Sequence, residues 1–160
     1  MNRINIYTDG SARGNPGPGG YGVLLEYNGY VKEISDGFKL TTNNRMELLA
    51  VIVGLESIKK KNYDICVFSD SKYVVEAINK GWVFNWEKRN FKQKKNPDLW
   101  KRFLQIYSDH NVKFIWVKGH SGHVQNERCD ELAVIASKAK ILKSDTGYEH
   151  SKHLPNSLFD

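Results

Sequence analysis

The chain has 160 residues, enough to close one hydrophobic core and few for two. Hydrophobic residues make up 40% of the chain and it has only 4 prolines, which excludes a disordered chain because enough apolar surface exists to offset the entropy lost on ordering. The net charge of +6 favours a polyanionic partner.

No segment has the features of a membrane anchor or an export signal. Apolar runs stay below the roughly 18 residues that a membrane helix needs, and the N-terminus has no signal-peptide core. The two cysteines, Cys66 and Cys129, are too few and too far apart for a disulfide framework, so we expect both to be core residues in a reducing compartment. These features predict a soluble cytoplasmic protein with no membrane partner.

The first part of the chain predicts three sequential antiparallel strands. Ile4, Ile6 and Thr8 alternate with polar residues, which indicates a strand with Asp9 at its end, followed by a turn-rich stretch over 10–20. Strand-like runs over 21–27 and 30–38 follow, joined by Asn-Gly at 28–29, the strongest short hairpin signal.

The rest of the chain alternates helices with strands. Apolar spacing predicts helices at about 43–59, 71–79, 99–107 and 125–140, and strands at 65–68 and 112–117. The predicted fold class is therefore α/β, with a five-stranded mixed sheet of three antiparallel strands and then parallel strands, flanked by helices. We expect one domain over 1–141 and a loosely structured tail over 142–160.

Four acidic residues occupy positions from which they can converge on one end of this sheet. Asp9 and Asp70 follow predicted strands, while Glu47 and Asp130 lie in or near the first turns of helices. Three of them also have a structural explanation, since Glu47 would complete a capping box with Asn44, Asp70 would cap a helix, and Asp130 would interact favourably with the dipole of the last helix. Together, four carboxylates need a cation or a raised pKa, and oxygen-only ligation suits two Mg²⁺ or Mn²⁺ ions in phosphoryl chemistry.

Three other motifs point less clearly to chemistry. The glycine-rich stretch 14–20 is a poor phosphate loop, because no Gly-Lys-Ser/Thr follows it. His120, His123 and Cys129 are candidate zinc ligands but lack a second cysteine pair, and the sequence around His120 misses the serine-hydrolase elbow. On its glycine-flanked loop, His120 remains a proton-transfer candidate.

A cluster of cations near the middle of the chain has the composition of a nucleic-acid interface. Residues 88–95 hold five cations and no anion, so five of the six net charges lie there: Lys88, Arg89, Lys92, Lys94 and Lys95. Phe91 lies among them and Trp82, Trp86 and Trp100 flank them, a mixture that suits backbone neutralisation and base stacking. Alternatively, the cationic run is a solvated charged face, and Trp86 and Trp100 lie in the core.

These motifs together resemble the type 1 ribonucleases H, bacterial type with a basic handle, which cut the RNA strand of RNA/DNA hybrids. The resemblance spans residues 4 to about 140 in order. The segments that carry it are Tyr-Thr-Asp-Gly-Ser at 7–11, the glycine-rich stretch at 14–22, Thr-Thr-Asn-Asn-Arg-Met-Glu-Leu at 41–48, Ser-Asp-Ser-Lys-Tyr at 69–73, Trp-Val-Lys-Gly-His-Ser-Gly-His at 116–123 and Asn-Glu-Arg-Cys-Asp-Glu-Leu-Ala at 126–133.

The resemblance implies a role for each matching residue. Asp9, Glu47, Asp70 and Asp130 would hold two Mg²⁺ ions, with Mn²⁺ as a substitute, and His120 would be the mobile histidine. Substrate would contact the handle (about 81–98), including Trp82, and a set of residues outside it: Gly10, Asn15, Thr42, Asn43 and Trp100. The products would carry 5′-phosphate and 3′-hydroxyl ends, and the enzyme would act as a monomer with no obligatory protein partner. The alternatives are a non-catalytic hybrid-binding module and a DNA-cutting nuclease of the same fold.

Overall fold

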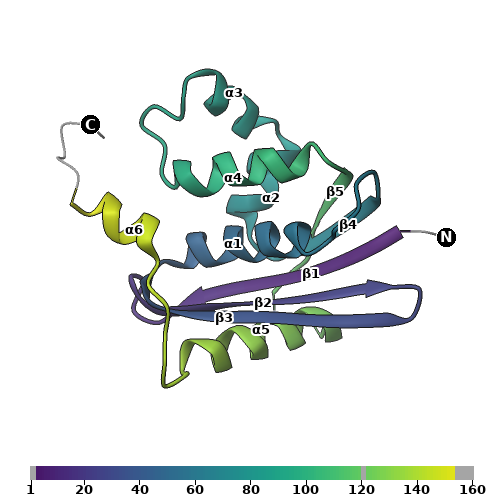
Figure 1. Cartoon of the computed structure of the whole chain (residues 1–160), viewed down its shortest axis with the longest axis horizontal. Coiled ribbons are helices and arrows are strands. Elements are labelled where there is room, and N and C mark those ends of the chain that lie inside the picture. Colours follow the sequence, from purple (N-terminus) through teal and green to yellow (C-terminus); the bar gives the residue numbers. More distant parts are fainter. Residues whose placement is uncertain (1–2, 120–121, 154–160) are drawn as a thin grey trace.

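A computed structural model describes residues 3–119 and 122–153, which form a five-stranded mixed sheet with helices on both faces (Figure 1). The elements are β1 (Arg3–Ala12), β2 (Gly17–Tyr27), β3 (Tyr30–Thr41), α1 (Asn43–Glu56), β4 (Asp64–Ser69), α2 (Lys72–Asn79), α3 (Trp82–Lys88), α4 (Pro97–Tyr107), β5 (Asn111–Trp116), α5 (Val124–Ser137) and α6 (Thr146–Ser151). The strand order is β3-β2-β1-β4-β5, antiparallel among the first three strands and parallel from β1 to β5, so the predicted fold class is confirmed. Within the described ranges, no helix has the length and apolar character that a membrane span requires.

Helix α1 lies between the sheet and α4 and is buried on almost every side. All residues from Arg45 to Ile52 are buried, which explains why its apolar residues do not keep to one stripe. Thr42 is the N-cap residue, and its hydroxyl accepts a hydrogen bond from the Arg45 N–H at 3.2 Å. The expected capping box between Asn44 and Glu47 is therefore wrong, and Glu47 is left without a capping role.

Helix α5 covers the opposite face of the sheet and packs on β1, β2 and β3 (Figure 1). The packing is close enough that a Cβ at Gly22 of β2 would lie 2.2 Å from the main-chain oxygen of Cys129. Glycine at this position lets the helix backbone approach the strand. The approach places the middle of α5 beside β1.

The glycine-rich stretch is mostly strand, whereas the sequence predicted turns over 10–20. β1 and β2 stay paired up to Ala12↔Gly19, so only residues 13–16 lie outside the two strands. Glycine is poor in isolated strands, but here the sheet pairing and the cover of α5 outweigh its propensity.

The segment after α5 is more ordered than the expected tail. Lys143 forms a bridge beside Phe38, and α6 follows with Asp145 as its N-cap. The buried Asp145 carboxylate accepts hydrogen bonds from Arg45 and Thr41, which lie about 100 positions earlier. Contacts over such a separation leave no periodic signal, so the pattern alone suggested a loose segment.

Candidate active site

Asp9 and Asp70 meet because they come from neighbouring parallel strands. β1 pairs with β4 as far as Tyr7↔Phe68; Asp9 lies two residues beyond this pair, and Asp70 directly follows β4. The carboxyl ends of parallel strands lie at one edge of a sheet, which brings the two side chains together. Asp9 still pairs with Gly22 of β2, so it lies beyond the pairing with β4 but not at the end of β1, which continues to Ala12.

Glu47 reaches the same edge from α1. A Cβ at Gly10 would lie 2.3 Å from the main-chain carbon of Met46 and 2.5 Å from the Glu47 nitrogen, so the helix backbone touches β1 next to Asp9. Only glycine permits this approach. One carboxylate oxygen from each of Asp9, Glu47 and Asp70 lies within 4.8 Å of the others.

Asp130 joins the three from α5 on the opposite face of the sheet. It is the seventh residue of the helix, in its second turn, and is half-buried. It lines the same hollow as the other three but is not part of their close group. We call this hollow the carboxylate cleft; its lining is Asp9, Gly10, Ser11, Asn43, Asn44, Glu47, Asp70, Ser71, Lys72, Tyr73 and Asp130.

The carboxylates perturb one another strongly. Burial, and then the negative charge of Asp70, raise the pKa of Asp9 from its ordinary 3.8 to about 8. Burial, and then the charges of Asp9 and Asp70, raise the pKa of Glu47 well above its ordinary value. Negative charge is therefore costly here unless a cation accompanies it.

The donor set fits a hard divalent cation. The Gly10 N–H holds one Asp9 oxygen at 2.9 Å, which fixes that carboxylate. Glu47 Oε1 and Asp70 Oδ1 are buried and have no hydrogen-bond partner among the described residues. Buried oxygens without partners, gathered with two further carboxylates in one cleft, match the oxygen ligation of Mg²⁺ and Mn²⁺.

The zinc alternative finds no support in the described part of the chain. The fully buried Cys129 thiol donates to the main-chain oxygen of Tyr7 at 3.2 Å, and burial raises its pKa. His123 lies against the rings of Tyr7 and Phe68. Among the residues described, Asp9, Glu47 and Asp70 form the metal-capable group, and His120 lies outside those residues.

The polar residues expected to hold the nucleic-acid backbone gather at one side of the cleft. Asn15 Oδ1 accepts a hydrogen bond from the Asn43 N–H at 3.0 Å, and Asn43 Oδ1 accepts one from the Ala12 N–H at 2.6 Å. Gly10 and Asn43 line the cleft directly, while Thr42 caps α1. The loop between β1 and β2 is thus tied to the start of α1. The contact of these residues with substrate stays a prediction.

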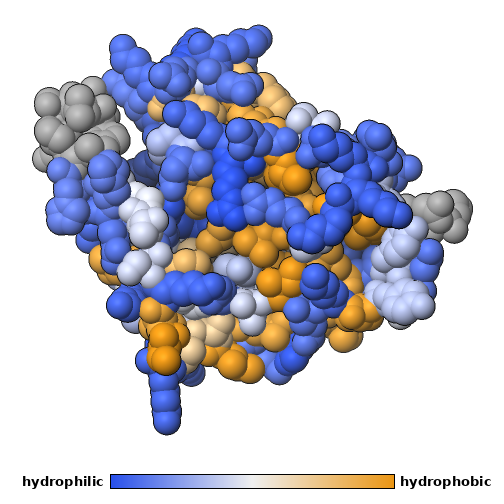
Figure 2. Space-filling model, in the orientation of Figure 1, coloured by the Kyte–Doolittle hydropathy of each residue, from blue (hydrophilic) through white to orange (hydrophobic). Residues whose placement is uncertain are grey.

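The basic handle projects from the helical face as α3 and the turn that follows it. All five of its cations are exposed, and none forms an ion pair with a described residue. Figure 2 shows hydrophilic residues covering this end of the molecule. A groove runs beside the handle, and we call it the handle groove; its lining is Lys72, Tyr73, Glu76, Trp82, Trp86, Gln93, Lys94 and Lys95.

The two tryptophans predicted to bind substrate have different surroundings. Trp82 is 42% exposed and lines the handle groove. Trp100 is fully buried against Trp86, Phe103 and Tyr73, so its assignment as a substrate contact is wrong. The first turn of α4 turns this side chain inward, and the core alternative holds for Trp100.

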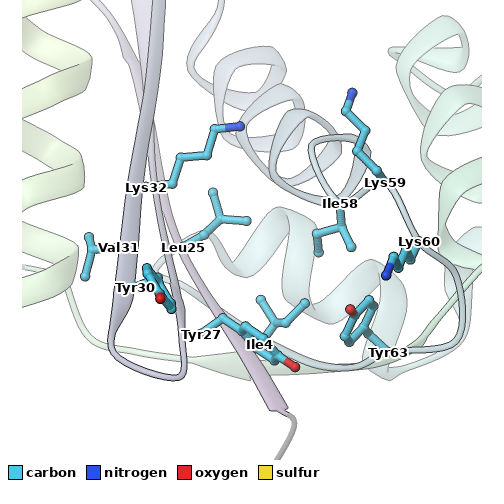
Figure 3. A pocket seen from close by; sticks show the side chains of 10 residues that line it. All are labelled: Ile4, Leu25, Tyr27, Tyr30, Val31, Lys32, Ile58, Lys59, Lys60 and Tyr63. Carbon is cyan, nitrogen blue, oxygen red and sulfur yellow. The ribbon is translucent and has the colours of Figure 1, made fainter.

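A third hollow lies at the other end of the sheet, between the β2–β3 hairpin and the loop after α1 (Figure 3). Its floor is apolar, with Ile4, Leu25 and Ile58, and lysines stand at its rim. Ile4 is five residues from Asp9 along β1, which corresponds to roughly 16 Å. No carboxylate lines this hollow, so it is separate from the candidate active site.

Sequence reasoning missed three residues that border the carboxylates. Asn126 of α5 donates long hydrogen bonds to the main-chain oxygens of Thr8 and Phe68, at 3.4 and 3.5 Å, just before Asp9 and Asp70. Lys72 and Tyr73 line the cleft from the start of α2. Their position directly after Asp70-Ser71 was the available signal.

Comparisons with known proteins point to one family. The RNase H family model matches residues 1–138. A relative called Ribonuclease H from Desulforamulus reducens is 55% identical over 150 residues, covering 91% of this chain and 94% of that relative. LC9-RNase H1, described as a type 1 RNase H with the type 2 active-site motif, has a similar structure, with a TM-score of 0.78 and 32% identity over 98% of this chain and 83% of its own. LC11-RNase H1, solved in complex with an RNA/DNA hybrid, has a TM-score of 0.61 and 29% identity over 83% of this chain and 95% of its own.

Proposed function

The chain belongs to the ribonuclease H family and is a ribonuclease that acts on RNA/DNA hybrids, and from this premise we propose that Asp9, Glu47, Asp70 and Asp130 hold two Mg²⁺ ions. The observation that carries the proposal is the close group of Asp9, Glu47 and Asp70, whose buried oxygens lack partners among the described residues. Divalent-metal dependence is general in the family, and the choice of Mg²⁺, with Mn²⁺ as a substitute, rests on the oxygen-only donor set.

The four carboxylates would hold two divalent ions, which would supply activation of the attacking water and stabilisation of the leaving 3′-oxygen; in-line displacement would then give 5′-phosphate and 3′-hydroxyl ends. The chain itself keeps the carboxylates in place. The Gly10 N–H holds Asp9, the contact between α1 and β1 places Glu47, and Asn126 joins β1 to β4 just before the two aspartates. His120, outside the described residues, would assist proton movement or product departure.

Substrate recognition is divided between two surfaces. Asn15, Thr42 and Asn43 would hold the nucleic-acid backbone beside the cleft, and Gly10 and Glu47 would lie near ribose 2′-hydroxyls, the groups that distinguish RNA from DNA. The exposed cations of the handle would neutralise phosphates farther along the duplex. The hybrid complex of LC11-RNase H1, which shares this fold, supports a hybrid as the ligand.

We also propose that the enzyme acts as a monomer in the cytoplasm. The main hydrophobic core contains buried residues of β1, β2, β4 and β5, and partly buried residues of β3 pack against it, which supports a unit that folds alone. Cys66 and Cys129 are buried free thiols, which suits a reducing compartment.

The test is cleavage of end-labelled substrates by the wild-type chain and by two matched variants. Asp9→Asn and Asp70→Asn should lower hybrid cleavage in Mg²⁺ by at least about 1000-fold, because they remove metal ligands, while hybrid binding stays within a few-fold. Asp64→Asn is the control, since Asp64 is exposed at the opposite end of β4 from Asp70.

The same assay separates the alternatives. RNA duplex, DNA duplex and hybrid are incubated with Mg²⁺, with Mn²⁺ or with EDTA. Cleavage of hybrid alone, lost in EDTA, is the expected result. Binding without cleavage would identify a hybrid-binding module, and cleavage of the DNA duplex would identify a DNA nuclease. Residual activity within tenfold of the wild type in either Asn variant would refute the assignment of the carboxylates.

A further inference from the structure

The carboxylate cleft and the handle groove share two lining residues, Lys72 and Tyr73. A nucleic-acid backbone that reaches both hollows must therefore pass these two side chains. Lys72 is exposed at the first position of α2, and it is the one cation among the described residues that line the cleft.

Tyr73, which lines both hollows, is held in place by two hydrogen bonds. Its hydroxyl oxygen accepts hydrogen bonds from Trp100 Nε1–H at 2.9 Å and from Asn96 Nδ2–H at 3.1 Å. Both donors belong to the start of α4 and the turn before it, so Tyr73 ties α2 to the base of the handle. Of the two residues that line both hollows, Lys72 is therefore the one that carries a charge.

Lys72 lies over an aromatic face and pairs with no carboxylate of residues 3–119 and 122–153. Its Nζ is 5.1 Å from the centre of the Trp116 ring, and no ion pair within the described residues includes it. An aromatic face attracts an ammonium more weakly than a phosphate does and leaves its three N–H donors free. The ammonium is therefore held beside the cleft yet remains able to bind an anion.

Trp116 is itself anchored to the active site. Its Nε1–H donates to the main-chain oxygen of Asp70 at 3.1 Å. This hydrogen bond fixes the position of the indole relative to Asp70. The indole keeps the Lys72 ammonium at the rim of the cleft, away from the carboxylates with which it would otherwise pair.

We propose that Lys72 binds a phosphate of the substrate at the point where its backbone crosses from the carboxylate cleft to the handle groove, and that Trp116 is the positioning residue that holds Lys72 there. This inference rests on the proposed function for the identity of the ligand. It adds a cationic contact between the carboxylate cleft, where the scissile bond would lie, and the phosphates that the handle would bind.

The first experiment measures hybrid binding against salt concentration in EDTA for Lys72→Ala, Lys72→Arg and a control, Lys60→Ala. The Lys60→Ala substitution removes the same charge at the far end of the sheet. Lys72→Ala should weaken binding by about 10-fold and flatten the slope of log affinity against log salt by about 0.9, the value for one phosphate. Lys72→Arg should restore most of both, and Lys60→Ala should change neither.

The second experiment tests Trp116 through a double-mutant cycle with Trp116→Phe, which loses the indole N–H but keeps a ring. In the wild-type background this variant should weaken binding roughly threefold, since phenyl attracts the ammonium less than indole does. In the Lys72→Ala background it should weaken binding no further, because its effect passes through Lys72. In both backgrounds kcat should stay within about threefold of the wild type, with the loss in KM.

The outcomes separate this inference from the proposed function. If the wild-type chain cleaves hybrid but Lys72→Ala keeps the salt slope of Lys60→Ala, the Lys72 contact is wrong. If Trp116→Phe lowers kcat equally in both backgrounds, Trp116 acts on Asp70 and not through Lys72. A wild-type chain that neither binds nor cleaves hybrid would refute the proposed function and this inference together.

Discussion

The guanidinium of Arg45 donates two hydrogen bonds to the carboxylate of Asp145, at 2.8 and 2.9 Å, across 100 positions of sequence. Both side chains are buried, with 3% and 8% of their surface exposed. The Thr41 hydroxyl donates a further hydrogen bond to Asp145 at 2.6 Å, and Asp98 pairs with the same guanidinium at 2.7 Å. This cluster joins α1, which carries Glu47, to α4 at the base of the handle and to α6.

Asp145→Ala should lower the free energy of unfolding by about 3 kcal/mol, because it leaves the buried Arg45 charge with only one of its two carboxylates. The control is Glu33→Ala, which removes an equally bidentate partner of Arg128 from a pair that is 37% and 38% exposed. An exposed pair contributes only about 0–1 kcal/mol. Urea unfolding of both variants measures the difference, and equal losses would contradict the importance of burial.

Asp9→Asn should stabilise the metal-free enzyme, and its advantage should grow as pH rises. The folded chain raises the pKa of Asp9 from 3.8 to about 8, so between these values the folded state binds more protons than the unfolded state. Wild-type stability therefore falls as pH rises through this window. One pKa unit corresponds to about 1.4 kcal/mol. The difference in free energy of unfolding between Asp9→Asn and the wild type should therefore increase by at least about 1 kcal/mol from about pH 5 to about pH 8.

Urea unfolding in EDTA at the two pH values measures this advantage. Asp64→Asn serves as the control, since its carboxylate is exposed. Saturating Mg²⁺ should reverse the order, because metal binding to the wild type adds to its folding free energy while the variant lacks a ligand. An advantage of Asp9→Asn that is the same at both pH values would show that Asp9 ionises normally.

Replacing the five handle cations, Lys88, Arg89, Lys92, Lys94 and Lys95, with alanine should raise KM and leave kcat little changed. They are exposed and lie on different elements from the carboxylates. The slope of log affinity against log salt should flatten by up to about 4.5 if each contacts a phosphate. The control removes three cations, Lys32, Lys59 and Lys60, which surround the hollow at the other end of the sheet. A handle variant with an unchanged slope would make the run a solvated charged face.

His120→Ala should lower turnover by about 10- to 1000-fold while cleavage stays dependent on Mg²⁺, the range expected for assistance in proton transfer. The control is His150→Ala, an exposed histidine of α6. Single-turnover cleavage and Mg²⁺ titration measure the two effects. Complete inactivity together with lost Mg²⁺ binding would instead make His120 a metal ligand.

The sequence by itself determined the order of the five strands and of α1, α2, α4 and α5, and the position of the aspartates, but it did not predict α3 or α6. Strand and helix periods are local properties, so Ile4 to Thr8 and the apolar run from Ile65 to Phe68 identified strands that the structure confirms. Since Asp9 and Asp70 follow those runs, their convergence at one edge of the sheet followed from chain order alone. The exposed charge of residues 88–95 was likewise visible, because charged side chains without buried partners stay in solvent.

The tertiary structure decided what depends on contacts between distant segments. Trp100 has the composition of a base-stacking residue, but packing against Trp86 and Phe103 puts it in the core. Asp145 lies in a segment with no periodicity, yet burial beside Arg45 orders it, because a charge removed from water must be paired. Lys72 lies at the start of a predicted helix, and only the fold shows that it lines both the carboxylate cleft and the handle groove. Local patterns record which way each residue prefers to face, and only packing determines which neighbours it finds there.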